Sequence, residues 1–226
     1  MPVDFNKLIE RHLHHDSRPK KVGYYYPSEA GNCMRKAWYS YKHPQPTDPK
    51  KGKYFYLGNI IHDFIAEVLE NPENTEVKLL EKEVSLKIPQ PEFMISGRLD
   101  DIFLLTADGR KFILEVKSTG QSLEWMKAPQ DAHVMQLQLY MHAHEVKEGI
   151  ILYIDKNSLE SKWFQVKYDT AVAEGVIARF ALLDGHLKKE QLPDPEARQR
   201  PEWAWMCKYC EYYDRCNADS AVKVAG

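Results

Sequence analysis

The sequence predicts an α/β protein in which a mixed sheet is flanked by helices. Three observations support this fold class: a strand hairpin around residues 97–118, a buried strand at 149–154, and helical apolar spacing at 131–146. Strands and helices alternate in an order typical of sheets covered by helices. With 226 residues, 43% of them hydrophobic, the chain is large enough to enclose a core.

The N-terminal part is predicted to hold two helices separated by a loop. A weak helix covers residues 5–14, and a loop rich in proline and lysine covers residues 43–53. Apolar residues then recur at helical spacing over residues 57–69. Asn71 followed by Pro72 ends this second helix.

The central and C-terminal parts supply the strands. Val84, Leu86 and Ile88 alternate with polar residues, which predicts a half-buried strand before the hairpin. The elements after the hairpin are expected in the order helix, strand, strand, helix, over residues 131–146, 149–154, 163–168 and 172–189.

The hairpin brings charged residues to one face of the sheet. Its connection contains Asp108-Gly109, a strong signal for a two-residue turn. Such a turn would place Asp100 opposite Lys117 and diagonal to Glu115, with all three side chains on one face. Asp101 would then point away, whereas a loop longer or shorter by one residue would exchange the two aspartates.

Two carboxylates and a lysine on one face suit metal-assisted hydrolysis of phosphodiesters. The carboxylates would hold hard divalent cations, Mn²⁺ or Mg²⁺, which polarise the phosphate and acidify a bound water. The lysine would stabilise charge in the transition state. The alternative is a surface hairpin whose outer face is simply charged.

Three residues outside the hairpin are candidates to assist. Gln136 and Tyr140 lie one turn apart on the helix at 131–146, where Gln136 could contact a phosphate or the attacking water. His62, expected in the first turn of its helix, could be a third metal ligand. The alternatives are an exposed glutamine and a capping or core histidine.

The region before residue 57 combines basic and aromatic residues. Nine lysines and arginines but only two acids lie between residues 18 and 53, interleaved with tyrosines and a tryptophan. This pattern suits single-stranded nucleic acid, because cations follow the phosphates and aromatic rings stack on bases. The alternative is a solvated basic surface whose tyrosines pack inward.

The four cysteines favour metal or redox chemistry in a cytoplasmic protein. Cys207, Cys210 and Cys216 crowd one segment, and Cys33 lies far upstream. Together they could close a tetrahedral sulfur site for zinc or for a cubane iron–sulfur cluster. No apolar run is long enough to span a membrane and the first residues lack a signal-peptide pattern, so we expect a cytoplasmic protein without membrane contact.

These motifs, taken in order, resemble the CRISPR-associated RecB-like exonucleases, which have a PD-(D/E)xK (restriction-endonuclease-like) core and a four-cysteine iron–sulfur cluster. The resemblance spans residues 24–216 and rests on six motifs in family order: Ser28-x4-Cys33-x-Arg35, Gly58-x3-His62, Gly97-x2-Asp100, Glu115-x-Lys117, Gln136-x3-Tyr140 and Cys207-x2-Cys210-x5-Cys216.

The resemblance implies a role for each motif. His62, Asp100 and Glu115 would bind the divalent metal, with the Val116 carbonyl as a candidate further ligand. Lys117 would be catalytic, and Gln136 with Tyr140 would position DNA. A [4Fe-4S] cluster would be held by Cys33, Cys207, Cys210 and Cys216.

The family's activity implies a metal-dependent exonuclease acting on single-stranded DNA or overhangs, usually 5′ to 3′, with endonuclease activity as an option. Its expected role is to process DNA for CRISPR spacer acquisition, with the CRISPR integrase complex as a partner. The alternatives are a stand-alone RecB-type repair nuclease and a non-catalytic subunit that binds DNA ends for an integrase. We expect a basic, aromatic arm at 1–56, a nuclease core at 57–191 and a cysteine-bearing tail at 192–226.

Overall fold

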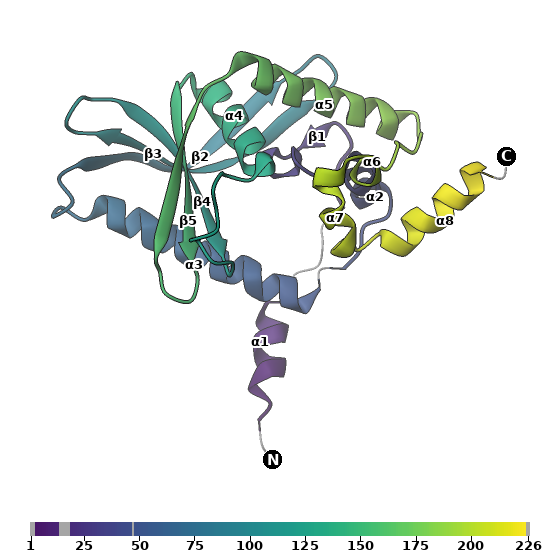
Figure 1. Cartoon of the computed structure of the whole chain (residues 1–226), viewed down its shortest axis with the longest axis horizontal. Helices are drawn as coiled ribbons and strands as arrows, with labels where there is room; N and C mark the ends of the chain where they lie inside the picture. The colour runs from purple at the N-terminus through teal and green to yellow at the C-terminus, as the bar shows by residue number, and fades with distance from the viewer. Residues whose placement is uncertain (1–2, 14–18, 47, 225–226) are drawn as a thin grey trace.

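A six-stranded mixed sheet forms the centre of the protein (Figure 1). The computed structural model describes residues 3–13, 19–46 and 48–224. The strands run β1-β3-β4-β5-β6, and β2 also pairs with β3. Two pairs, β1–β3 and β4–β5, are parallel and the other three are antiparallel, so the predicted mixed sheet is confirmed. The strands are β1 (Tyr24–Tyr25), β2 (Val77–Pro89), β3 (Met94–Leu105), β4 (Lys111–Thr119), β5 (Glu148–Asp155) and β6 (Ser161–Lys167).

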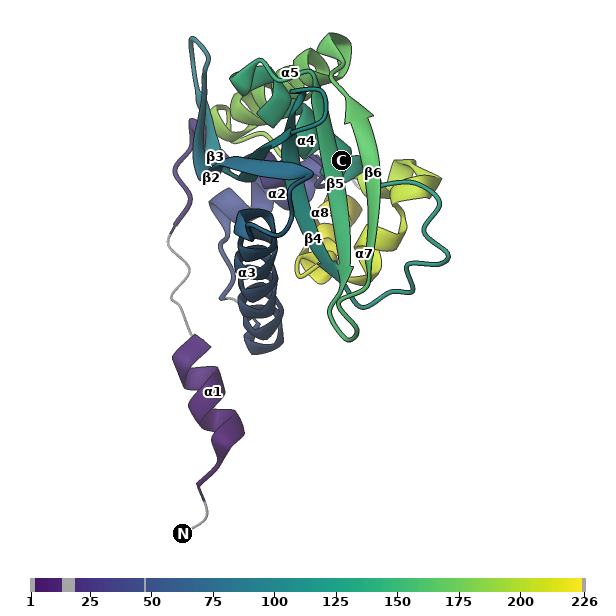
Figure 2. The ribbon, with the colours of Figure 1, turned by 90° about the vertical axis from the view of Figure 1, so that its left-hand side faces the viewer.

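Helices cover both faces of the sheet (Figure 2). On one face, α3 packs Ile61 and Ile65 against Phe112 and Leu114. On the other face, α4 and α5 join α2 in a larger core. The helices are α1 (Phe5–Leu13), α2 (Met34–Lys42), α3 (Pro49–Glu70), α4 (Asp131–His144), α5 (Thr170–Lys188), α6 (Glu196–Gln199), α7 (Trp205–Lys208) and α8 (Tyr213–Val224), with short 3-10 turns at Pro27–Glu29 and Pro201–Trp203.

Helix α3 begins earlier than the sequence predicts. Asp48 accepts a hydrogen bond from the backbone N–H of Lys50, and Pro49 occupies the first turn, so a cap and a helix-compatible proline start the helix inside the expected loop. His62 therefore lies in the middle of α3, and its predicted place in the first turn is wrong. The expected boundary between residues 56 and 57 also falls within this helix.

The hairpin register differs from the predicted one by two residues. Leu104 pairs with Lys111 and Asp101 with Leu114, so the two-residue loop and the pairing of Asp100 with Lys117 are wrong. Thr106 instead bonds the segment just before β2, where its hydroxyl donates to the Thr75 carbonyl and its backbone N–H donates to the Glu76 carbonyl. A shift of two residues keeps each side chain on its face, which explains why the choice of Asp100 survives the longer loop.

The aromatic residues of the N-terminal part divide into two groups. Tyr25, Tyr39 and Tyr41 are buried in the core, as the alternative of inward-packed tyrosines predicts. Tyr54 and Phe55, on the first half of α3, are exposed. Helix α2 and strand β1 carry the buried group, and neither element was predicted from the sequence.

The chain ends are described in part. Helix α1 projects from the body of the protein in Figure 2, and Lys53 of α3 pairs with its Glu10. The predicted end of this helix at His14 lies outside the described residues. No helix in the described ranges is long and apolar enough to cross a membrane.

Polar contacts fasten the C-terminal segment to α2, and the two lie side by side in Figure 1. The Arg35 guanidinium donates to the Pro193 carbonyl and to Ser220, and the Tyr39 hydroxyl donates to Asp219. Glu196 accepts from the backbone N–H of Met34. Residues more than 150 positions apart in the chain therefore form one unit.

Candidate active site and cysteine cluster

The predicted catalytic side chains meet where β3 and β4 separate. One edge of β3 pairs with β1 at residues 94–95 and with β4 at 101–104, which leaves residues 96–100 without a strand partner on that edge. Asp100 is the last residue of this unpaired stretch. Its Oδ2 accepts a 2.7 Å hydrogen bond from the backbone N–H of Val116, which holds the carboxylate against β4.

Glu115 and Lys117 form a buried ion pair beside Asp100. Glu115 is 1% exposed, and its Oε1 lies 2.5 Å from the Lys117 Nζ. The same oxygen makes no well-aligned hydrogen bond with any described residue. A buried carboxylate oxygen without such a bond is costly, so this atom is suited to receive a further cationic partner.

A chain of hydrogen bonds connects the pair to α4. Lys117 donates to Gln136 Oε1 at 3.3 Å, and Gln136 donates through Nε2 to the Tyr140 hydroxyl at 2.7 Å. Tyr140 in turn donates to the Arg98 carbonyl, which lies in the unpaired stretch of β3. Gln136 is buried, so its reading as an ordinary exposed glutamine is wrong.

Helix α3 contributes His62 from the other side of the site. Its Nδ1 lies 3.3 Å from Asp100 Oδ1. Burial alone would lower the pKa of His62, but the neighbouring Asp100 carboxylate outweighs it and raises this pKa. The imidazole therefore responds to the same negative charge that would attract a metal ion.

Burial dominates the protonation of Glu115. It raises the pKa of this carboxyl to about 7, against the opposing charge of Lys117, and the Asp100 carboxylate raises it further. Burial acts to lower the pKa of Lys117, yet Glu115 and Asp100 raise it overall. The lysine thus stays charged while burial favours the protonated form of Glu115, and a bound divalent cation would favour its carboxylate form instead.

The donors suit a hard cation, although they are not arranged as a bound ion would hold them. Carboxylate oxygens and one imidazole nitrogen are ligands for Mg²⁺ or Mn²⁺. Within the described ranges, no three histidine, cysteine, aspartate or glutamate side chains are already gathered at metal-binding distances. His62 and Asp100 nevertheless line one hollow, where the carboxylates of Asp63, Glu67 and Glu70 add negative charge.

Asp101 belongs to this hollow as well, and sequence reasoning missed it. It is only 2% exposed, and burial followed by the adjacent Asp100 raises its pKa to about 6. Its pairing partner Leu114 packs against α3. The sequence offered one signal for this position. Asp63 and Glu67 lie four residues apart on one face of α3, so an aspartate on the side of the sheet that α3 covers would lie beside other acidic side chains.

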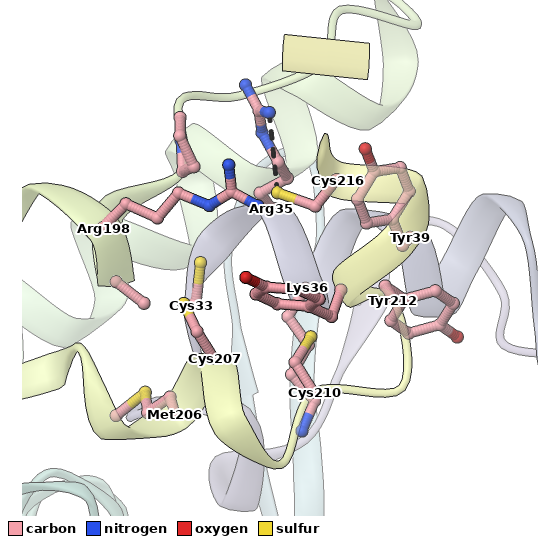
Figure 3. Close-up of a pocket in the computed structure, with 13 residues that line it drawn as sticks. Cys33, Arg35, Lys36, Tyr39, Arg198, Met206, Cys207, Cys210, Tyr212 and Cys216 are labelled. Atoms are coloured by element: carbon pink, nitrogen blue, oxygen red, sulfur yellow. Dashed lines mark hydrogen bonds between the residues drawn. The ribbon is translucent and has the colours of Figure 1, made fainter. Parts of the chain in front are cut away.

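The four cysteines line a second hollow (Figure 3). Cys33 sits at the N-terminal end of α2, and the other three come from α7, α8 and the turn between them. All four are free thiols. Cys33 is buried with Ala197 and Trp203, while Met206 and Cys207 pack on that group.

Cations surround the thiols in Figure 3. Arg35 Nη1 lies 3.7 Å from the Cys216 Sγ, and Lys36 and Arg198 also line the hollow. Burial raises the pKa of the Cys210 thiol, so this cysteine is poorly suited to be a free thiolate in the metal-free protein. This burial argues against Cys210 as a cysteine that reacts with solvent species.

Comparison with known proteins defines the class of this protein. The family model for the PD-(D/E)XK nuclease superfamily matches residues 28–217, so the chain belongs to that superfamily. Among characterised proteins it is similar to the CRISPR-associated exonuclease Cas4 of Saccharolobus solfataricus, with 25% identity over 215 residues, covering 94% of this chain and 95% of that protein.

Solved structures share the fold. The crystal structure of SSO0001 has a TM-score of 0.59 at 22% identity and covers 91% of this chain and 90% of its own. An alkaline exonuclease from Laribacter hongkongensis, LHK-Exo, has a TM-score of 0.51 at 11% identity, covering 75% of this chain and 90% of its own. The predicted PD-(D/E)xK-like mixed α/β fold is therefore confirmed.

Proposed function

We propose that this protein is a divalent-metal-dependent exonuclease that hydrolyses single-stranded DNA. The observation that carries the proposal is the buried Glu115–Lys117 pair, which lies beside Asp100 at the point where β3 and β4 separate. The similarity of the whole chain to the Cas4 exonuclease adds support, as does the fold that it shares with LHK-Exo, which was crystallised with dAMP. The polarity we propose is 5′ to 3′.

Mn²⁺ or Mg²⁺ would be held by His62, Asp100, Glu115 and the Val116 carbonyl. When bound, such an ion supplies Lewis-acid polarisation of the phosphate and lowers the pKa of a coordinated water. The backbone N–H of Val116 fixes the orientation of Asp100, so this ligand needs little rearrangement.

Of the remaining residues, Lys117 acts on the substrate directly, and Gln136 and Tyr140 act by positioning it. The Lys117 ammonium stabilises the negative charge that develops on the phosphate. Gln136 orients Lys117 through its side-chain oxygen and is in turn oriented by Tyr140. Tyr140 also contacts the Arg98 carbonyl, which ties α4 to β3 and keeps the glutamine facing the reacting phosphate.

The test is cleavage of end-labelled single-stranded DNA with Mn²⁺, Mg²⁺ or EDTA. We expect cleavage with either metal, none in EDTA, and a loss of at least about 100-fold in Lys117→Ala. Lys111→Ala is the matched control, since it removes an exposed lysine from the start of the same strand. Undiminished cleavage by Lys117→Ala would refute the mechanism, and strand binding without cleavage would favour the DNA-end-binding alternative.

We also propose that Cys33, Cys207, Cys210 and Cys216 bind a [4Fe-4S] cluster that joins the arm at 1–56 to the tail at 192–226. Support comes from the shared hollow of the four thiols and from the cations around it. Anaerobically purified protein should be brown, with a broad visible absorption that bleaches on reduction. A colourless protein with stoichiometric zinc would contradict the iron assignment.

The biological role we propose is processing of DNA for CRISPR spacer acquisition in the cytoplasm, together with an integrase complex. Its support is the Cas4 relative, which aligns over nearly the whole length of both chains. The protein should trim overhangs so that an integrase accepts the product. Trimming of repair intermediates with no effect on integration would favour the RecB-type alternative.

A further inference from the structure

The N-terminal half of α3 borders another large hollow, separate from the hollow that contains Asp100. Four lysines line this hollow, which we call the basic basin: Lys20, Lys36, Lys51 and Lys208. Two carboxylates, Asp48 and Glu211, also line it, and Glu211 pairs with Lys36 and Lys51. Lys20 also pairs with the buried Glu29, so four lysines face three carboxylates, and the small excess of positive charge in the basic basin complements a polyanion.

Aromatic side chains line the same basin: Tyr54, Phe55, Tyr209 and Tyr212. Phe55 is 65% exposed and Tyr54 is 59% exposed, and the Lys156 ammonium lies 4.3 Å from the Tyr54 ring centroid. Large exposed rings beside lysines are typical of surfaces that stack unpaired bases while holding phosphates. A double helix would keep its bases inside and gain nothing from these rings.

The spacing along α3 connects the basic basin to the active site. Phe55 and His62 are seven residues apart, so they lie on one face, separated by about 10 Å along the axis. Phe55 lines the basic basin, and His62 lines the hollow described above that contains Asp100. A strand that leaves the basin along this face therefore arrives at the candidate metal ligands.

Gly58 lies between the two hollows on this face. A glycine inside a helix costs about 1 kcal/mol relative to alanine. Packing does not require it here, because an added Cβ would lie 3.8 Å from Ser118 Oγ, an ordinary contact. Ser118 follows Lys117 on β4, so α3 approaches the strand that carries Lys117 at Gly58 with no side chain between them.

We infer that single-stranded DNA follows α3, with bases stacked on Tyr54 and Phe55 and its backbone passing Gly58 to reach Asp100 and Glu115. This inference rests on the proposed nuclease function and adds the route of the substrate. The lysines of the basic basin hold the phosphates on the 3′ side of the cleaved bond, in the part of the strand that is still uncut.

The first test measures binding of a fluorescein-labelled dT15 strand by anisotropy in EDTA. Phe55→Ala should bind about tenfold more weakly and Phe55→Trp should restore binding, because base stacking depends on the ring. Tyr24→Ala is the matched control: Tyr24 is 44% exposed and carries Lys21 4.7 Å from its ring, but it pairs with Met94 at the far end of β3. Binding of a 15-base-pair duplex should not change.

The second test uses Gly58→Ala. The Gly58→Ala protein should melt at the wild-type temperature or higher. Its kcat/KM on single-stranded DNA should nevertheless be lower, because the added methyl group narrows the route of the strand. Photo-cross-linking of iodouracil-containing strands should label Tyr54 or Phe55.

The outcomes separate the route from the function. Unchanged strand binding by Phe55→Ala, or an equal loss in Tyr24→Ala, would overturn the route even if the protein cleaves DNA. Weakened binding by Phe55→Ala alone would support the route even if no metal produced cleavage, in which case only the nuclease proposal fails.

Discussion

Replacing Glu115 with glutamine should change how the stability of the metal-free protein depends on pH. The folded protein binds the Glu115 proton more tightly than the unfolded chain, since burial raises the pKa from 4.5 to about 7. Between these values the folded state carries more protons, so the free energy of unfolding falls as the pH rises. The difference in pKa corresponds to about 3 kcal/mol.

The assay is urea unfolding in EDTA, followed by tryptophan fluorescence from pH 4.5 to 8. We expect the free energy of unfolding of Glu115→Gln to gain about 3 kcal/mol on that of the wild type between pH 4.5 and 7, and the difference to stay constant above pH 7. Glu160→Gln, which makes the same replacement in the exposed turn after β5, should follow the wild type.

Metal addition gives the complementary measurement. At pH 7.5, Mn²⁺ should stabilise the wild type by about 1.4 kcal/mol when its concentration is tenfold above the Kd, and Glu115→Gln much less. Parallel stability curves for wild type and Glu115→Gln across the whole pH range would refute the argument, because they would show that burial leaves this carboxyl unperturbed.

Three further substitutions test the packing and the polar contacts around the site. Gly149→Ala should lose about 1–3 kcal/mol of stability, because its Cβ would lie 2.9 Å from both terminal methyl groups of the buried Leu137, while Gly175→Ala, with open space, should be neutral or stabilising by thermal melting. Arg179→Met should lose about 3 kcal/mol at pH 7 by urea titration. Burial acts to raise the pKa of Glu196, but the Arg179 guanidinium lowers it overall. The stability that this pair contributes is therefore lost as Glu196 becomes protonated, so the loss in Arg179→Met should shrink as the pH falls below 4.5. Tyr140→Phe should slow single-strand cleavage about tenfold in the end-label assay, with a stability loss near 1 kcal/mol, since Gln136 and the Arg98 carbonyl lose a partner; wild-type rates would remove Tyr140 from a positioning role.

The hairpin and the elements after it were predictable because their signals are local. Apolar alternation and helical spacing identified β5, α4 and α5 to within a few residues of their observed bounds. The choice of Asp100 was secure against the error in loop length, because only a shift by an odd number of residues changes the face. The longer loop includes Thr106, whose hydroxyl donates to the carbonyl of Thr75, 31 residues earlier in the chain, and no local pattern reveals that contact.

The rest of the site depends on contacts between distant parts of the chain. Gln136 is buried because α4 packs against α5 and against strands of the sheet, which places this polar side chain beside Lys117. Helix α2 escaped prediction because its tyrosines look like a binding surface, whereas Tyr39 and Tyr41 in fact face the core. Asp101 lines the same hollow as Asp100 because α3 packs beside this part of the sheet, a contact that the local sequence does not reveal.

The union of α2 with the C-terminal segment has a consequence for synthesis in the cell. Cys33 is buried against Ala197 and Trp203, and Arg35 is held by Pro193 and Ser220. A ribosome working at about 5–20 residues per second needs roughly 8–35 s to make the chain between these parts. During that interval the Cys33 thiol lacks the cover that Ala197 and Trp203 give it in the folded protein.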